Sequence, residues 1–453
     1  MSKNIVLKKG LDLPVTGEAE LRLSKSASPD IVAIEPACFK GFTPRLLVKE
    51  GDRVLCGSPV MADKKNPDIL FASPASGTVK EISRGEKRKL LAVLIQADEK
   101  QECLDFGAKD PSGLDAARIK AALLESGLWP FIIQRPYGIL ADPASTPKAI
   151  FVSAFSTAPL AASPEFTLGD RMADLQKGVD ALAKLTPGGV HISLNAKNCA
   201  TTPFAGLKNA TFHVFEGKHP AGNVGVQISH VCPIVKGDTV WTVSMEGLAA
   251  IGHLFAKGNY CVRRKVAVTG PAAIEPNYME VLPGTPMRVF ASHFGGDSEG
   301  VRIISGDILT GRTVGEKGYL GFFDNQVTIL REGTEKELLG WINPLRFNLF
   351  SNDRSYFSWL LPKKKYDMDT NLHGGPRAFV MGDSYYGKVL PMDIYPLYLI
   401  KACLAGDIDK MEKFGIYEVL PEDLAICEFT DPSKNNIQDI VAKGIDLMLK
   451  EMA

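Results

Sequence analysis

The chain has no closely spaced metal ligands. Its eight cysteines are scattered, and no two stand closer than eighteen positions, so no C-x-x-C pair occurs. The seven histidines are equally dispersed and form no H-x-x-x-H pair. Metal sites in proteins usually draw on such short spacings. The spacing therefore argues against a metal site and favours reduced, mostly structural thiols, as expected of a cytoplasmic protein.

A phosphate-binding loop is also missing. Neither G-x-G-x-x-G nor the Walker pattern occurs, although phosphate cradles need glycines so that backbone N–H groups can approach the anion. Residues 382–387 contain an isolated pair of glycines, which turn geometry explains. Residues 219–225 follow a predicted strand and fit a ligand loop and a tight structural turn equally well. Both interpretations of that loop stay open.

Long apolar runs and an excess of one charge are absent too. The longest apolar run, residues 149–162, is interrupted by Ser, Thr and Pro, whereas a membrane span needs about twenty apolar residues. The first ten residues have too short an apolar stretch for a secretory signal. Lys+Arg and Asp+Glu number 52 each, so the basic excess typical of nucleic-acid binders is missing. We therefore expect a soluble chain that binds no nucleic acid and meets a membrane only through partners.

The amino-acid composition is that of a globular protein. Hydrophobic residues make up 45% of the 453 positions, which suffices for a sizeable core, and the length suggests about three domains. Residues 31–97 hold short apolar segments separated by turns, which is typical of a small β module. Strand and helix patterns alternate over residues 112–269, which predicts a largely parallel α/β sheet. After residue 392 the pattern is helical over 393–405, 407–414, 421–425 and 435–452.

The β module carries a recognisable repeat. Residues 48–57 read V-x-x-G-D-x-V-x-x-G, and residues 74–79 read P-x-x-G-x-V. Paired turns of this kind resemble the barrel-sandwich fold of lipoyl and biotin carriers, where the modified lysine sits between the two halves. Lys64 and Lys65 lie between the halves here, but the first half is shorter than in the carriers. A structural copy of the fold is favoured, and an acylated lysine remains the alternative.

Segments along almost the whole chain resemble one family, the A subunits of the Na⁺-translocating NADH:quinone reductases of bacterial respiratory chains. They are residues 8–14 (KKGLDLP), 127–131 (GLWPF), 217–222 (GKHPAG), 240–242 (VWT), 249–252 (AAIG), 266–271 (VAVTGP) and 427–434 (CEFTDPSK). The resemblance implies a multidomain α/β protein. Its expected parts are a carrier-like barrel-sandwich module in residues 1–100, a Rossmann-like α/β domain in 101–261, a β-grasp-like (SLBB) domain in 262–340 and a C-terminal helical domain in 341–453.

That family is similar in turn to the C subunit of the Rnf complex and to the NADH-binding flavoprotein subunit of complex I. Those relatives hold flavin and nucleotide phosphates with a run of the form G-x-G-G-A-G-F-P. Here Trp129 and Phe131 stand in the matching stretch, so we expect the phosphate site to be closed. The relatives also bind an iron–sulfur cluster through cysteines, whereas residues 353–361 contain none and only Cys427 matches the fourth ligand.

The resemblance implies a peripheral cytoplasmic subunit, working with five other subunits to pass electrons from NADH to ubiquinone and to pump Na⁺. FAD, FMN, the Fe–S clusters and the NADH site are expected in the partners, with no cofactor on this chain. For a quinone head group we single out Trp129, Phe131, Gln134, Arg135 and His219, because such a ligand needs hydrogen-bond donors in an apolar pocket. The alternatives are a pure assembly scaffold, a lipoyl or biotin carrier and a flavin–NADH dehydrogenase. No catalytic residue is assigned.

Overall fold

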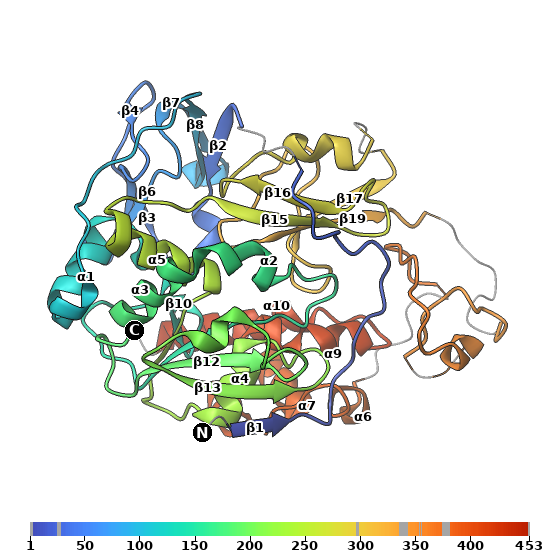
Figure 1. Cartoon of the computed structure of the whole chain (residues 1–453). Coiled ribbons are helices and arrows are strands. Elements are labelled where there is room, and N and C mark those ends of the chain that lie inside the picture. The colour runs from blue at the N-terminus through green and yellow to red at the C-terminus, as the bar shows by residue number, and fades with distance from the viewer. Residues whose placement is uncertain are drawn as a thin grey trace.

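The computed structural model describes residues 3–24, 29–295, 299–334, 343–352, 354, 356–373 and 381–451, and Figure 1 shows how they are arranged. The described residues form four sheets and, towards the C-terminus, a group of helices. Every helix among these residues is too short or too polar to cross a lipid bilayer.

The N-terminal module is made of two small antiparallel sheets that share one apolar core. Along its longest strands the burial alternates, so that Val79 is buried while Thr78 and Lys80 are exposed, as expected of strands with one face in a core. The four-stranded sheet contains β2 (Ile31–Ile34), β8 (Leu90–Ala97), β7 (Gly77–Arg84) and β4 (Arg53–Val54). The three-stranded sheet contains β3 (Pro44–Leu46), β5 (Pro59–Asp63) and β6 (Leu70–Ala72). The predicted barrel-sandwich fold is confirmed.

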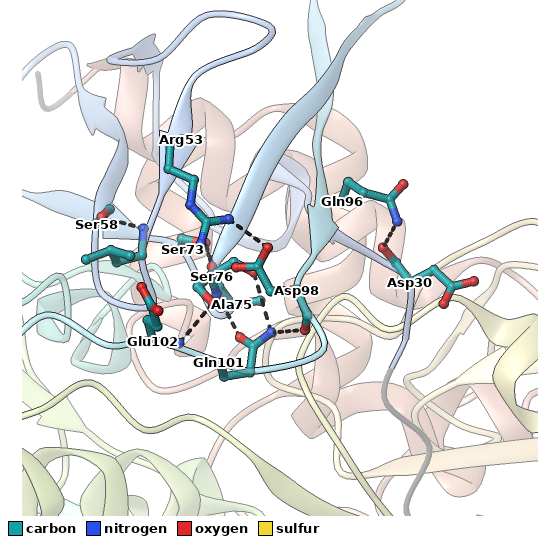
Figure 2. Close-up of polar contacts among 11 residues, drawn as sticks. Asp30, Arg53, Ser58, Ser73, Ala75, Ser76, Gln96, Asp98, Gln101 and Glu102 are labelled. Carbon is teal, nitrogen blue, oxygen red and sulfur yellow. Dashed lines mark hydrogen bonds and ion pairs between the residues drawn. The ribbon is translucent and has the colours of Figure 1, made fainter.

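The segment that leaves this module is held against one of its buried turns, as Figure 2 shows. The backbone N–H of Ser76 donates to Oε1 of Gln101 at 2.7 Å, and Oγ of Ser76 accepts from the backbone N–H of Glu102 at 2.9 Å. Arg53 and Asp98 add an exposed ion pair at 2.7 Å, which contributes little. The buried Ser76 contacts therefore fix the path of the exit segment.

The second unit is built on a seven-stranded sheet. In spatial order its strands are β1 (Lys3–Val6), β13 (Ala210–Glu216), β12 (Val190–Asn195), β11 (Ile150–Ser153), β14 (Val240–Thr242), β9 (Ile133–Arg135) and β10 (Ile139–Leu140). The first five strands run parallel, while β9 and β10 are antiparallel to their neighbours. The predicted α/β domain is confirmed.

Successive residues of β11 enter different cores, because side chains alternate between the faces of a strand. Ile150 and Val152 pack into the core that contains Leu175 and Leu248, whereas Phe151 packs into the core of the C-terminal helices. The sheet is therefore covered on both faces, as parallel sheets usually are. The helices of this unit are α1 (Ala116–Glu125), α2 (Pro164–Leu168), α3 (Met172–Leu182), α4 (Val224–Val231) and α5 (Met245–Lys257).

A smaller mixed sheet forms the third unit. Its strands, in spatial order, are β16 (Asn277–Val281), β15 (Arg264–Thr269), β19 (Gln326–Arg331), β17 (Val301–Ser305) and β18 (Arg312–Thr313). The 3₁₀ helix η7 (Met287–His293) supplies Met287 and Phe290 to its core. This is the predicted SLBB domain.

The C-terminal unit is helical, as predicted. It contains α6 (Asp383–Tyr386), α7 (Pro396–Ala405), α8 (Ile408–Phe414), α9 (Ala425–Thr430) and α10 (Ile437–Glu451). Gly406 ends α7 and Gly415 ends α8, both in the left-handed region with φ of 66° and 103°, a conformation that glycine adopts without strain. In Figure 1 these helices lie along one face of the seven-stranded sheet.

The first strand does not belong to the module that follows it in the chain. β1 pairs in parallel with β13, with Lys3 opposite His213. The chain then runs past the third unit, where the N–H of Gly270 donates to the carbonyl of Gly17 at 2.9 Å and Leu23 forms a bridge with Tyr278. The long blue trace in Figure 1 follows this path from β1 to the module. The N-terminal segment thus touches the second and third units before entering the first.

Candidate functional site

A cleft of about 430 Å³ opens where the parallel strands of the seven-stranded sheet end. Ser153 ends β11 and Thr242 ends β14, and both line the cleft. From β11 the chain moves to β12 on one side and later returns to β14 on the other. Open α/β sheets bind ligands at this kind of topological switch point, so we call this space the switch-point cleft.

Two further units complete its walls. The third unit contributes Asp307 and Asp324, and the C-terminal unit contributes Leu420 and Glu422. A volume of this size lies within the range of about 300–1,000 Å³ found for small-molecule sites. The cleft is therefore large enough for a small ligand and lies where three units meet.

Phe131 forms an apolar part of the wall. It ends the 3₁₀ helix η4 (Trp129–Phe131), is 2% exposed and lines the cleft. Its ring lies 4.9 Å from that of Phe322 and 6.0 Å from that of Phe323, measured between centroids. Phe39 of the N-terminal module lies 4.8 Å from Phe322. These aromatic contacts connect the first three units and hold Phe131 in position.

Arg135 lies in the same wall and is the centre of a buried ion pair. One guanidinium nitrogen lies 3.0 Å from Oδ2 of Asp423, and the other lies 3.0 Å from Oε1 of Glu422. Burial lowers the pKa of the Arg135 guanidinium, but the two carboxylates outweigh this effect and raise it overall. The Nε of Arg135 is buried and has no hydrogen-bond partner among the described residues. The guanidinium thus keeps one unsatisfied donor beside the cleft.

The Asp423 carboxylate is fully buried and well satisfied. In addition to Arg135, it accepts from the backbone N–H of Leu420 at 3.1 Å and from Nδ2 of Asn223 at 3.4 Å. Gly225 in the first turn of α4 makes room for this pair, since an added Cβ would lie 2.2 Å from Oδ2 of Asp423. The ion pair therefore joins the α/β unit to the C-terminal helices.

The other three residues singled out from the sequence are not among the residues that line the cleft. Trp129 is fully buried, donates from Nε1 to the carbonyl of Ala141 at 2.7 Å and packs edge-on against Trp241. Gln134 is half-buried, and its Oε1 accepts from the N–H of Asp142 at 3.3 Å.

His219 lies at the start of the loop that the sequence left open between a ligand loop and a structural turn. It is 2% exposed, its N–H donates to Asp12 at 2.9 Å, and Nδ1 lies 3.2 Å from Oγ1 of Thr157. Its Nε2 has no partner within the described part of the chain. Burial lowers the pKa of the imidazole, which keeps it neutral at physiological pH. Gly222 from the same loop does line the cleft.

The charges that line the cleft are mostly negative. Glu246, Asp307, Asp324 and Glu422 line it, whereas Arg135 is the one cation among the described lining residues. Burial raises the pKa of Asp324, although a hydrogen bond from Oγ of Ser305 at 2.5 Å acts in the opposite direction. A ligand with several negative charges would be repelled here. The lining fits a neutral or cationic ligand better.

Among the described residues, no group of three or more Cys, His, Asp or Glu side chains is arranged to hold a metal ion. Cys427, which matches the fourth cluster ligand of the relatives, is fully buried in the core of the C-terminal helices, and burial raises the pKa of its thiol. Of the cysteine-free stretch 353–361, residues 353 and 355 lie outside the described residues.

The sequence interpretation missed most of the polar lining. Ser153 and Thr242 could have been found, because each lies at the end of an apolar strand of the parallel sheet. Asp307 and Asp324 carry no such signal, since they reach the cleft from loops of a different unit.

Comparison with known families matches three successive parts of the chain. The NqrA N-terminal barrel-sandwich hybrid domain matches residues 5–98, the NqrA second alpha/beta domain matches 114–260, and the NQRA C-terminal domain matches 265–316. The chain of a solved NAD⁺-reducing [NiFe]-hydrogenase is 15% identical, with a TM-score of 0.31 and coverage of 48% of this chain and 47% of its own.

Curated relatives match over nearly the full length. The A subunit of the Na(+)-translocating NADH-quinone reductase of Yersinia pestis bv. Antiqua (strain Angola) is 38% identical, covering 95% of this chain and 96% of its own. The subunits of the same name from Vibrio parahaemolyticus and Rhodopirellula baltica are 36% and 35% identical, covering at least 98% of each chain. The chain therefore belongs to the NqrA family, the A subunits of the Na⁺-translocating NADH-quinone reductases.

Proposed function

We propose that this chain is a peripheral cytoplasmic subunit of a six-subunit complex that oxidises NADH, reduces ubiquinone and pumps Na⁺ out of the cytoplasm. The NADH site, FAD, FMN and Fe–S clusters belong to the five partner subunits in this proposal. The relatives' names, which combine Na⁺ translocation with NADH-quinone reductase, support the role of the complex. For this chain we further propose that the switch-point cleft takes the head group of a quinone.

The charge of the cleft supports a quinone over a nucleotide. Four carboxylates line it, and its one described cation, Arg135, is already paired with Asp423 and Glu422. A pyrophosphate would meet uncompensated negative charge there, whereas a quinone head group is neutral. The position at the switch point is one where α/β sheets bind planar ligands, and Phe131 offers an aromatic wall to such a ring.

The main support for the proposal is the unsatisfied Nε of Arg135. A buried N–H without a partner costs about 1–3 kcal/mol, and this cost is removed when a ligand oxygen accepts from it. A quinone carbonyl is an acceptor without charge, so it satisfies the donor and adds nothing to the negative lining. Arg135 and Phe131 were both singled out from the sequence for this role.

Blocking the cleft tests the proposal. Ala158 lines the cleft and is half-buried, so Ala158→Phe places a ring inside it. Ala144 is exposed and does not line the cleft, so Ala144→Phe is the matched control. We expect Ala158→Phe to weaken ubiquinone binding about tenfold or more, equivalent to about 1.4 kcal/mol, in titrations of the purified subunit. NADH-driven quinone reduction by the assembled complex should fall in parallel, while Ala144→Phe should change neither.

Substitutions of the predicted residues give a second test. Phe131→Ala removes the aromatic wall, and His219→Ala removes a buried imidazole from the loop that also supplies Gly222 to the cleft. If both variants kept the wild-type quinone affinity and turnover, the proposed quinone site would be wrong. A subunit that serves only as a scaffold would show no saturable quinone binding in the same titration.

A further inference from the structure

Two cysteines that lie far apart in the sequence are direct neighbours where the chain leaves the N-terminal module. Cys56 and Cys103 are partners in a parallel β-bridge. The N–H of Cys56 donates to the carbonyl of Glu102 at 2.9 Å, and the N–H of Leu104 donates to the carbonyl of Cys56 at 2.9 Å. Neighbouring strands lie about 4.7–4.9 Å apart, which falls within the Cα separation of about 4.4–6.8 Å that a disulfide requires.

The two side chains are neighbours, because residues paired directly across two strands point to the same face. Cys56 is 6% exposed, and its Sγ also lies 3.3 Å from the carbonyl of Tyr260 and 3.6 Å from that of Pro74. Cys103 is exposed to solvent. Cys103 is therefore accessible to a small reagent, whereas Cys56 is buried beside it.

The surroundings make the exposed member the more acidic thiol. The neighbouring thiol of Cys56 lowers the pKa of Cys103 to about 7, helped by the nearby His253 and opposed by partial burial. The same contact raises the pKa of Cys56, and burial adds to that effect. Thiolates are the nucleophilic form of cysteine. At neutral pH, a large fraction of Cys103 is thus reactive, whereas Cys56 stays protonated.

We propose that Cys103 and Cys56 form a thiol pair that a hydroperoxide oxidises to a reversible disulfide. The Cys103 thiolate attacks one peroxide oxygen and becomes a sulfenic acid, while the O–O bond breaks. With hydrogen peroxide the other oxygen leaves as hydroxide, which a proton converts to water; with an organic hydroperoxide it leaves as an alkoxide, which a proton converts to an alcohol. The Cys56 thiol then attacks the sulfenic sulfur, forming the S–S bond, and its proton leaves with the hydroxyl group as water. The peroxide takes up the two electrons that the two thiols lose.

The disulfide would tie the exit segment to the turn between β4 and β5, in the first half of the module. Cys56 lies in the turn between β4 and β5, and Cys103 lies in the segment that leads into the α/β unit. The sequence separates the two cysteines by 47 positions, so spacing rules for paired ligands or redox motifs do not reveal them. Intracellular disulfides in most organisms are transient and sense the redox state. Redox-sensing cysteines are typically accessible, acidic thiols that lie beside a second thiol able to form the disulfide with them.

Oxidation of the assembled complex, followed by peptide mapping, tests the proposal. The complex is treated with hydrogen peroxide, the remaining thiols are alkylated under denaturing conditions, and the peptides are analysed by mass spectrometry. We expect a linked pair of peptides carrying Cys56 and Cys103, lighter by two hydrogens than their sum and separated by dithiothreitol. A link from Cys103 to Cys261, or a sulfinic acid at Cys103 without a link, would overturn the proposal.

Single substitutions assign the two roles. In Cys56→Ser the sulfenic acid at Cys103 should persist and react with dimedone, whereas Cys103→Ser should abolish both the link and the dimedone adduct. Cys261 is half-buried near the pair, so Cys261→Ser is the matched control and should leave the link unchanged. A dimedone adduct at Cys56 instead of Cys103 would reverse the roles and contradict the proposal.

The pH dependence of alkylation gives an independent readout on the unoxidised protein. Iodoacetamide should modify Cys103 with a rate that rises through a midpoint near pH 7. Burial raises the pKa of Cys38 and Cys403 to about 11, so these thiols should react slowly over the same range and serve as internal controls. In Cys56→Ser the midpoint of Cys103 should change because the neighbouring thiol is replaced. A Cys103 midpoint near that of an ordinary thiol in the wild-type protein would contradict the geometry.

Discussion

Replacing Arg135 by methionine should lower the free energy of unfolding by about 3–5 kcal/mol, which is typical when one partner of a buried ion pair is removed. The side chain of Arg135 is 2% exposed and that of Asp423 is 0% exposed. Without the guanidinium, the Asp423 carboxylate would stay buried with hydrogen bonds from Leu420 and Asn223 but no counter-charge. Methionine fills much of the same volume, so the loss reports mainly on charge.

The second carboxylate provides the matched control. Glu422 makes an ion pair with the same guanidinium at the same distance of 3.0 Å, but its side chain is 42% exposed. Solvent screens such a pair, so Glu422→Gln should cost no more than about 1 kcal/mol. Combining Arg135→Met with Asp423→Asn should recover a large part of the loss, because no charge then remains buried and the amide oxygen still accepts from Leu420.

Equilibrium unfolding of the purified subunit in urea, followed by the fluorescence of its buried tryptophans, measures these differences. The double-mutant cycle isolates the coupling between Arg135 and Asp423. A loss below about 1 kcal/mol for Arg135→Met, or an equal loss for Glu422→Gln, would refute the reasoning. Either result would mean that burial does not set the strength of these two ion pairs.

Gly225→Ala should lower the thermal stability of the protein, because the added Cβ would press on Asp423. This loss should appear although alanine is more favourable than glycine in a helix by about 1 kcal/mol. Gly113→Ala is the control in the same thermal unfolding assay, since nothing lies within 4 Å of its added Cβ. Burial raises the pKa of Glu418 to about 7, so the folded state keeps a proton that the unfolded chain has released above about pH 4.3. The free energy of unfolding should therefore fall as the pH rises from about 4.3 to 7. Glu418→Gln should remove this contribution to the pH dependence when unfolding is measured across the same range. Lys64 is exposed in the turn between β5 and β6, and we expect an intact mass equal to that of the unmodified sequence; a lipoyl or biotinyl increment would favour the carrier alternative.

Helices and strands with a clear apolar period were predicted well. The helix expected over 407–414 is α8, and the alternation of strands and helices expected over 112–269 includes β12 and α5. α4 was missed because four consecutive residues, 225–228, are buried, so the helix has no polar face to give a period. β1 was missed for a different reason. Four residues at a sheet edge carry too little pattern, and its partner β13 lies some 200 residues further along the chain.

The candidate site shows that a short sequence motif does not predict which of its residues line a cleft. Trp129 and Phe131 stand two positions apart and were taken together, yet only Phe131 lines the cleft. In a 3₁₀ helix, residues three apart lie on one side while residues two apart do not. Arg135 was predicted as a donor to a ligand, whereas its partner Asp423 lies 288 positions away in another unit. Such a partner depends on how separate units pack, which no local pattern encodes.

The position of β1 has a consequence for the order in which this protein can be completed during synthesis. β1 emerges from the ribosome long before the strand that pairs with it, β13, which starts at residue 210. At about 5–20 residues per second, β1 waits roughly 10–40 s for its partner. The N-terminal module can close during that wait, since all strands of its two sheets lie between residues 31 and 97. β1 is therefore the last strand to join the α/β sheet, and we expect a tag fused to the amino terminus to slow this final pairing step.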